Sequence, residues 1–116
     1  MKIEIEISDQ DIIDVLTTAL EGGSNYWYWI EELPKDLNKE FSTSESICKY
    51  VLAHPENKIM ISDVETDEEL GYLCKDNIRT GISLFTSAGY SFDPAMDAND
   101  ADILFQYIVM GEVVYG

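Results

Sequence analysis

Two acidic segments place oxygen ligands at the close spacing that calcium-binding loops use. They read Asp97-Ala-Asn-Asp-Ala-Asp102 and Asp63-Val-Glu-Thr-Asp67. An EF-hand loop has oxygen ligands at its fifth and twelfth positions and glycine at its sixth. A loop starting at Asp97 has Ala101 and Ile108 at the fifth and twelfth positions, and the second segment has Glu68 in place of the glycine. We therefore favour a capped helix start and a solvated turn, with no metal or cofactor, and keep weak divalent-cation binding as an alternative.

The chain has few of the groups that nucleophilic catalysis requires. Its single histidine, His54, precedes Pro55 in a predicted turn, and its two cysteines, Cys48 and Cys74, fit no C-x-x-C spacing. The sequence has no G-x-S-x-G motif, no H-E-x-x-H motif and no glycine-rich phosphate loop. We expect buried thiols in a reducing compartment and no enzymatic activity. A small metal-dependent or Cys/His enzyme stays open as an alternative, because residues distant in sequence can meet in a fold.

The most unusual local feature is the aromatic run Tyr26-Trp27-Tyr28-Trp29. Because Trp and Tyr dominate the binding energy of protein interfaces, the run is a candidate interaction surface. Stacking on a base or a sugar is a second interpretation, weakened by the lack of nearby cations. A third interpretation is a strand or helix that buries part of the aromatic surface, and we favour this structural role.

Acidic residues form the other candidate surface. Alternate residues on a strand lie about 6.6 Å apart, and helical neighbours three residues apart lie about 5–6 Å apart. These spacings are comparable to those of phosphates on a nucleic-acid strand. They favour, as an alternative function, an acidic nucleic-acid mimic that inhibits a host DNA- or RNA-binding protein, whereas the plainest explanation of the charge is solubility. The candidate residues are Glu4, Glu6, Asp11, Asp14, Glu65, Asp67 and Glu68.

The composition is typical of one folded, soluble domain. The 116 residues include 23 acidic and 7 basic side chains, which gives a formal net charge of -16, and 46% of the residues are hydrophobic. No apolar run approaches the ~18 residues of a membrane span, and no secretory signal is recognisable. Direct binding to nucleic acid is not expected, because it requires clustered Lys and Arg. We expect a single domain over residues 1–116 that is cytoplasmic and does not contact a membrane.

Hydrophobic periodicity predicts the elements of the first half of the chain. Residues 2–7 alternate apolar and charged side chains, which is typical of a half-buried strand. A helix follows from the predicted N-cap Ser8 to the glycine pair at 22–23. Residues 25–30 are ambiguous between a strand and a helical turn. A second helix starts within residues 42–44 and stops at 54–57.

In the second half, strands at 58–62 and 69–74 are expected to form a hairpin, followed by a helix at about 76–88. The last helix starts near Asp97 and ends at Gly111. It is apolar nearly all round, and its helical wheel leaves little but Asn99, Asp102 and Gln106 to face water, so it is expected to be central. The predicted fold is α+β: a small antiparallel sheet with strands near 2–7, 58–62 and 69–74, an optional strand at 113–115, and about four helices.

Residues 19–27 read A-L-E-G-G-S-N-Y-W, and residues 97–116 read D-A-N-D-A-D-I-L-F-Q-Y-I-V-M-G-E-V-V-Y-G. Together these blocks resemble a family of small uncharacterised proteins encoded by bacteriophages and prophages. Its pattern is A-L-E-G-G-x-N-Y-W followed, after a hairpin and a helix, by D-A-x-D-A-D-x-x-x-Q-Y-x-x-x-G-E-x-V-Y-G. The family has a cysteine after the Tyr-Trp pair, where this chain has Tyr28, so any role of that cysteine is absent here.

The resemblance implies a phage or prophage origin and a bacterial cytoplasm, and it implies no activity. Phage origin favours binding proteins that interfere with host machinery, an inference by analogy. We therefore expect a non-enzymatic protein-binding module that acts on a host or phage protein. Its surface is expected to include part of the aromatic run and neighbouring acidic residues.

Overall fold

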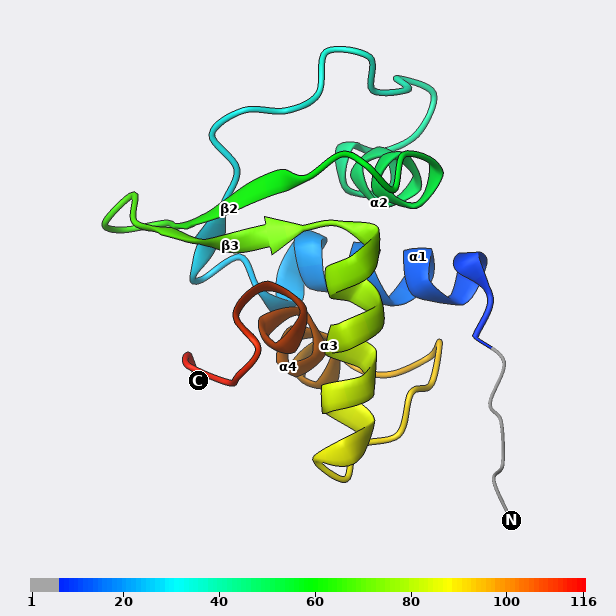
Figure 1. Ribbon diagram of the computed structural model, residues 1–116, viewed down its shortest axis with the longest axis vertical. Helices are drawn as coiled ribbons and strands as arrows, with labels where there is room; N and C mark the ends of the chain where they lie inside the picture. The colour runs from blue at the N-terminus through cyan, green and yellow to red at the C-terminus, as the bar shows by residue number, and fades with distance from the viewer. Residues whose placement is uncertain (1–6) are drawn as a thin grey trace.

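Four helices pack with a three-stranded antiparallel sheet in the computed structural model, which describes residues 7–116 (Figure 1). The α+β class is therefore confirmed. The predicted strand at 2–7, with Glu4 and Glu6, lies outside the described residues except for Ile7. In chain order the elements are α1 (Asp9–Thr18), the π-helical turn η1 (Ala19–Gly23), β1 (Tyr28–Trp29), α2 (Thr43–Ala53), β2 (Ile59–Asp63), β3 (Glu69–Leu73), α3 (Lys75–Ser87) and α4 (Ala98–Met110).

Local side-chain chemistry sets the ends of three helices. Ser8, Ser42 and Asp97 each accept a hydrogen bond from the backbone N–H three residues further on, at 2.9 to 3.2 Å. Such caps satisfy backbone donors that have no partner inside the helix. At the other end of α4, Gly111 has a φ of 75°, the left-handed conformation that glycine adopts without a Cβ penalty. The predicted caps Ser8 and Asp97 and the predicted stop at Gly111 are confirmed.

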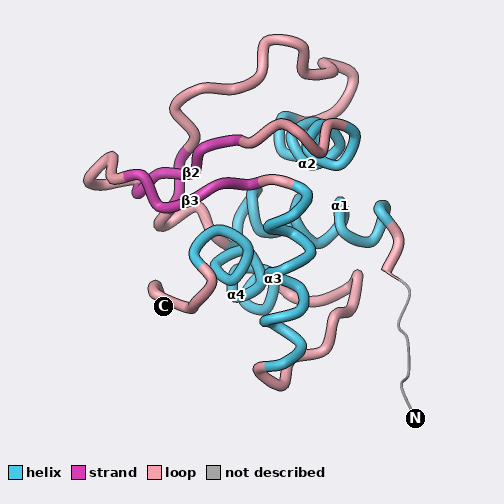
Figure 2. Tube along the Cα trace, viewed as in Figure 1, coloured by secondary structure: helices cyan, strands magenta, loops and turns pink. Residues whose placement is uncertain are grey.

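The sheet has the strand order β1-β2-β3. The predicted hairpin of β2 and β3 is confirmed, and Ile59 pairs with Leu73 and Ile61 with Gly71. Ile59, Ile61 and Leu73 are buried, whereas Tyr72, on the opposite face of β3, is exposed. The ambiguous aromatic segment supplies the third strand, since β1 pairs antiparallel with the end of β2. Figure 2 shows the long loop between β1 and α2 arching over β2.

Residues 113–115 do not form a strand, which corrects that prediction. Their backbone is tied to α4 through a side chain instead, because the N–H groups of Val114 and Tyr115 both donate to Gln106 Oε1 at 2.8 Å. The Gln106 side chain therefore accepts backbone hydrogen bonds that a neighbouring strand would accept in a sheet.

Helix α4 occupies the centre, as its nearly all-apolar surface predicts, and two glycines allow its close packing. A Cβ atom at Gly71 on β3 would lie 2.0 Å from the carbonyl oxygen of Val109. A Cβ atom at Gly81 on α3 would lie 2.6 Å from the Cα atom of Ile108. Both distances are far inside van der Waals contact, so only glycine lets β3 and α3 approach the α4 backbone this closely.

Candidate functional site

The aromatic run at residues 26–29 is divided between the core and the surface. Trp27 is 1% exposed and belongs to the hydrophobic core. Tyr28 and Trp29 are half-buried, and the Tyr28 hydroxyl donates a hydrogen bond to the Leu20 carbonyl oxygen at 2.6 Å. Tyr26 is 51% exposed. The predicted interaction surface is corrected accordingly: Trp27 is out of a partner's reach, and Tyr26 is its most accessible member.

A buried carboxylate on α4, that of Asp102, accepts hydrogen bonds from three residues: Ser24, just before the aromatic run, and Tyr26 and Trp27 within it. Asp102 is 5% exposed. Its Oδ1 accepts hydrogen bonds from the Ser24 hydroxyl and from Nε1 of Trp27, both at 2.7 Å. Its Oδ2 accepts hydrogen bonds from the Tyr26 hydroxyl at 2.5 Å and from Nε2 of Gln106 at 3.2 Å. Each carboxylate oxygen therefore has two donors, which offsets much of the cost of removing the charge from water.

Gln106 links this carboxylate to the C-terminal segment. Besides accepting from Val114 and Tyr115, its buried amide donates from Nε2 to the Tyr115 carbonyl oxygen at 3.0 Å. The helical wheel predicts that Asp102 and Gln106 face water, and the structure corrects this. Both are buried because specific donors and acceptors from other segments satisfy them. We call the connected set the Asp102 network; its members are Ser24, Tyr26, Trp27, Asp102, Gln106 and Tyr115.

A close backbone approach brings the two halves of the network together. At Gly23, which ends η1, a Cβ atom would lie 2.5 Å from the carbonyl oxygen of Ala98 at the start of α4. The absence of a side chain lets η1 pack directly on α4, and Ser24 follows with its hydroxyl bonded to Asp102. The two sequence blocks at 19–27 and 97–116 are therefore neighbours in space, and together they supply every member of the Asp102 network.

Tyr115 fastens the C-terminal segment to the aromatic run and to the sheet. Its ring stacks on Trp27, with ring centroids 5.1 Å apart. Its hydroxyl donates to Asp63 Oδ2 at 2.7 Å, and the backbone N–H groups of Glu65 and Thr66 donate to Oδ1 of the same carboxylate. These bonds, that of Tyr115 foremost, hold the pKa of Asp63 below its usual value. The Asp63 carboxylate in turn raises the pKa of Tyr115 to about 12.

A hollow of about 440 Å³ opens beside the Asp102 network. It lies between the glycines that end η1, the first turns of α4 and the C-terminal segment. Asp102 is the one charged side chain among its described lining residues. Among the lining residues Val113 is 46% exposed, and Val114, the next residue along the chain, is 54% exposed. The side chains that line it are those of Tyr26, Ala98, Asn99, Asp102, Ile103, Val113 and Tyr115.

The acidic segments considered for calcium make structural hydrogen bonds. Asp97 caps α4, Asp102 lies in the network, and Asp63 holds the turn after β2. Among residues 7–116, no three His, Cys, Asp or Glu side chains lie close enough together to hold a metal ion. The chemistry seen at both segments is that of a helix cap and a tight turn.

The histidine and the two cysteines lie in separate surroundings. Cys48 is buried on α2, and burial raises the pKa of its thiol to about 12, so that little thiolate forms at neutral pH. Cys74 is a buried free thiol directly before α3. The ring of His54 lies 4.5 Å from that of Tyr50, and its Nδ1 lies 3.8 Å from a carboxylate oxygen of Glu56. In the part of the chain that the structure describes, no hydrogen bond joins His54 to either cysteine.

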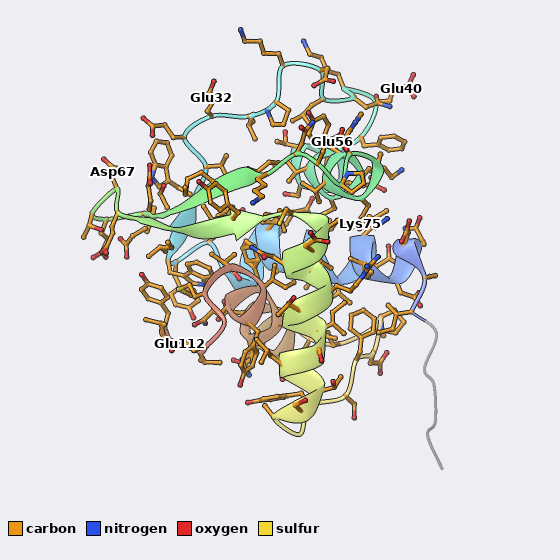
Figure 3. All side chains as sticks on the ribbon, in the orientation of Figure 1. Glu32, Glu40, Glu56, Asp67, Lys75 and Glu112 are labelled. Atoms are coloured by element: carbon orange, nitrogen blue, oxygen red, sulfur yellow. The ribbon has the colours of Figure 1, made fainter. Side chains whose placement is uncertain are left out.

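The described members of the candidate acidic surface lie on opposite sides of the molecule. Asp11 and Asp14 belong to α1, at one side, whereas Glu65, Asp67 and Glu68 lie in the turn between β2 and β3, at the other (Figure 1). The structure therefore does not gather them on one face. Acidic side chains lie around much of the outline in Figure 3, as the labelled residues Glu32, Glu40, Asp67 and Glu112 show.

Ser24, Asp102 and Gln106 are not predicted as site residues from the sequence. The sequence does contain a signal for two of them, because Asp102 and Gln106 lie one turn apart on a helix that is apolar on nearly all its other sides.

None of the helices in residues 7–116 is long and apolar enough to cross a membrane. No family model matches the chain, and neither a curated protein nor a solved structure matches it.

Proposed function

We propose that the chain is a non-enzymatic protein-binding domain of phage or prophage type that acts on a host or phage protein in the bacterial cytoplasm. The observation that carries this proposal is the exposure of three large apolar side chains at one place. Tyr26, Val113 and Val114 are all about half exposed, and Tyr26 and Val113 line the same hollow. We call these three residues the Tyr26–Val114 surface. Scattered apolar residues are normal on a protein surface, whereas a gathered group indicates an interaction site.

The support beneath this surface fits a binding role. Tyr26 is held by its bond to Asp102, and Val114 is held through its backbone N–H by Gln106. Because the Tyr26 side chain and the Val114 backbone are held before a partner arrives, binding loses less conformational entropy there. The resemblance of both sequence blocks to phage and prophage proteins supports the proposed origin, although it assigns no partner.

The net charge of -16 favours a partner with a positive surface. Nucleic acid itself is unfavourable as a partner, because its phosphates carry the same sign of charge. The mimic alternative gains no support from the described acidic residues, since α1 and the hairpin turn present them on opposite sides (Figure 1). A protein with a basic and partly apolar surface is the partner that we propose.

The test begins with affinity capture from a bacterial lysate, followed by identification of the captured protein and measurement of its Kd by calorimetry. A double variant, Val113→Asp and Val114→Asp, is expected to weaken binding at least ~10-fold, because two apolar contacts are replaced by charges. Val64→Asp is the matched control, since Val64 is also exposed but lies in the hairpin turn. Equal affinity of the double variant and the wild type would overturn the proposal.

A further inference from the structure

We propose that the hollow beside Asp102 is a binding site for the positively charged end of an arginine or lysine side chain of the protein partner. This inference rests on the proposed function and names the chemical group that the partner presents. The hollow is about 440 Å³, within the range of about 300–1,000 Å³ that is usual for ligand sites, so a whole basic side chain fits inside it.

The charge of Asp102 is the first reason. All four of its hydrogen-bond donors are neutral: a hydroxyl, a phenol, an indole and an amide. They solvate the carboxylate but leave its negative charge in place. No basic side chain lines the hollow in the described part of the chain, where every Lys and Arg falls between residues 35 and 79. An unbalanced charge in a poorly solvated site attracts a cation more strongly than the same charge in water does.

The Tyr26 hydroxyl is the second reason, because it offers the cation a hydrogen-bond acceptor. Its proton points to Asp102 Oδ2 at 2.5 Å, and Gln106 Nε2 donates a long hydrogen bond of 3.5 Å to its oxygen, which keeps a second lone pair for a further donor. A hydroxyl that donates to a carboxylate is polarised and becomes a better acceptor. Burial and the Asp102 carboxylate raise the pKa of Tyr26 to about 12, so the group is a neutral phenol at physiological pH.

Aromatic surface is the third reason. Tyr26 and Tyr115 both line the hollow. The face of an aromatic ring attracts an ammonium or guanidinium group, and the attraction increases when the cation is partly removed from water. A guanidinium also stacks flat on such rings, which favours arginine over lysine.

The start of α4 is the one feature that favours an anion, and it is already neutralised. Ala98 and Asn99 border the hollow at the end of the helix that attracts negative charge. However, the carboxylate of Asp97 caps this end and accepts the N–H of Asp100 at 2.9 Å. An anion in the hollow would also face Asp102. A cation is therefore the ligand that the lining fits.

A protein side chain is a better occupant than a free amine, because the edge of the hollow is apolar and exposed. Val113 and Val114 offer contact area to a partner's surface that a small amine would leave uncovered. The Tyr26–Val114 surface and the hollow thus form one continuous interface, with the apolar contact outside and the charged contact inside.

The test uses the full chain labelled with ¹⁵N and titrated with N-acetyl-arginine amide, with N-acetyl-citrulline amide as the uncharged control of the same shape. We expect saturable shifts at the backbone N–H of Gly22 and Gly23 and at the Trp27 indole N–H, with at least ~10-fold weaker binding of the citrulline probe. Equal binding of both probes, no binding of the arginine probe, or shifts confined to other residues would overturn the inference.

Two variants test the site itself. Tyr26→Phe keeps the ring and removes the acceptor, so binding of the arginine probe is expected to fall about 5-fold or more, whereas Tyr72→Phe, at an exposed tyrosine on the sheet, should leave it unchanged. Asn99→Arg places a tethered guanidinium at the hollow and should abolish probe binding, while Asn99→Gln should preserve it. Unchanged probe binding in Asn99→Arg, with its folded NMR spectrum retained, would also overturn the inference.

The captured partner separates this inference from the proposed function. If Tyr26→Phe and Asn99→Arg weaken the partner's binding as they weaken probe binding, the partner's basic side chain occupies the hollow. If they leave the partner's affinity unchanged while the Val113/Val114 double variant weakens it at least ~10-fold, the proposed function stands and the basic side chain in the hollow is refuted. If the arginine probe binds but no variant affects the partner, the ligand is a free cationic molecule, and both proposals fail.

Discussion

The indole ring of Trp27 lies almost parallel to the phenol ring of Tyr115, with their centroids 5.1 Å and their planes 8° apart. The first ring belongs to the aromatic run after η1, and the second belongs to the C-terminal segment. The indole also donates to Asp102, and the backbone of Tyr115 is held by Gln106. One stacked pair therefore joins the aromatic run to the C-terminal segment, and tryptophan fluorescence, to which Trp27 contributes, should report any change that detaches them.

Removal of the buried Asp102 carboxylate should lower the free energy of unfolding considerably. Asp102→Ala leaves the donors of Ser24, Tyr26, Trp27 and Gln106 without their acceptor, and the expected loss of unfolding free energy is about 3–5 kcal/mol. Urea denaturation followed by fluorescence measures it. Asp100→Ala, in the same helical turn, should cost less than about 1 kcal/mol. Equal losses in the two variants would contradict a structural role for the network.

Gln106→Leu should release the C-terminal segment. The substitution keeps similar volume but removes the groups that bind the N–H of Val114 and both polar backbone groups of Tyr115. Hydrogen exchange at these two amides should become at least ~10-fold faster relative to amides of α3, because about 1–3 kcal/mol is lost for each buried group left without a partner. Gln10→Leu, at an exposed glutamine on α1, is the control and should leave these amides protected. Unchanged protection in Gln106→Leu would show that the segment is held in another way.

Glycine substitutions test how tightly α4 is enclosed. In Gly81→Ala the new Cβ atom would lie 2.6 Å from the Cα atom and 2.8 Å from the N atom of Ile108, so α3 and α4 must separate. We expect a loss of at least about 2 kcal/mol, measured by thermal and urea unfolding. Gly22→Ala is the matched control: no atom of residues 7–116 lies within 4 Å of its Cβ position, and the substitution should be neutral or stabilise by about 0.4–1 kcal/mol. A mild effect at Gly81 would mean looser packing than described.

Alkaline pH should unfold the protein through three tyrosines. The pKa values of Tyr26, Tyr28 and Tyr115 are each raised to about 12, against 10.0 for a free tyrosine. A group with a raised pKa in the folded state contributes stability that is complete below pH 10 and is lost as the pH rises toward 12. Absorbance of tyrosinate and tryptophan fluorescence, recorded together against pH, should show late ionisation that coincides with unfolding. Ionisation of all tyrosines near pH 10 with the fold intact would refute the shifts.

The bond between Tyr115 and Asp63 should matter less in acid. Because this bond is the main cause of the lowered pKa of Asp63, its contribution is present above pH 3.8 and is lost as the pH falls further. Tyr115→Phe should therefore lower the Tm at pH 7, and its difference from the wild type should shrink toward pH 2. Tyr90→Phe, where the ring stacks on Phe85, should show no such pH dependence.

Local chemistry explains which elements could be predicted from the sequence. Ser8 and Asp97 cap helices through bonds to residues three positions away, so their role is visible in a short window. The central place of α4 also follows from its own composition. Apart from the bond that Asp102 and Gln106 make to each other, their partners come from residues 24–27 or from the C-terminal segment. A helical wheel, which contains no such partners, assigns both residues to water.

Which segments pair with each other was harder to predict than whether each segment forms a helix or a strand. The aromatic run does supply a strand, but its two-residue length and its partner Asp63 depend on where the β2–β3 hairpin lies. Residues 113–115 have the composition of a strand, yet the Gln106 side chain accepts the hydrogen bonds of their backbone N–H groups. No sequence pattern indicates that a side chain will bind a backbone segment in this way.

The net charge of -16 acts on a positively charged partner before any atoms touch. Among residues 7–116 every Lys and Arg falls between positions 35 and 79, and none lines the hollow beside Asp102, so no described basic side chain repels such a partner there. Attraction at a distance speeds the encounter, and dissolved ions weaken it. Added salt should therefore slow association with such a partner far more than it hastens release.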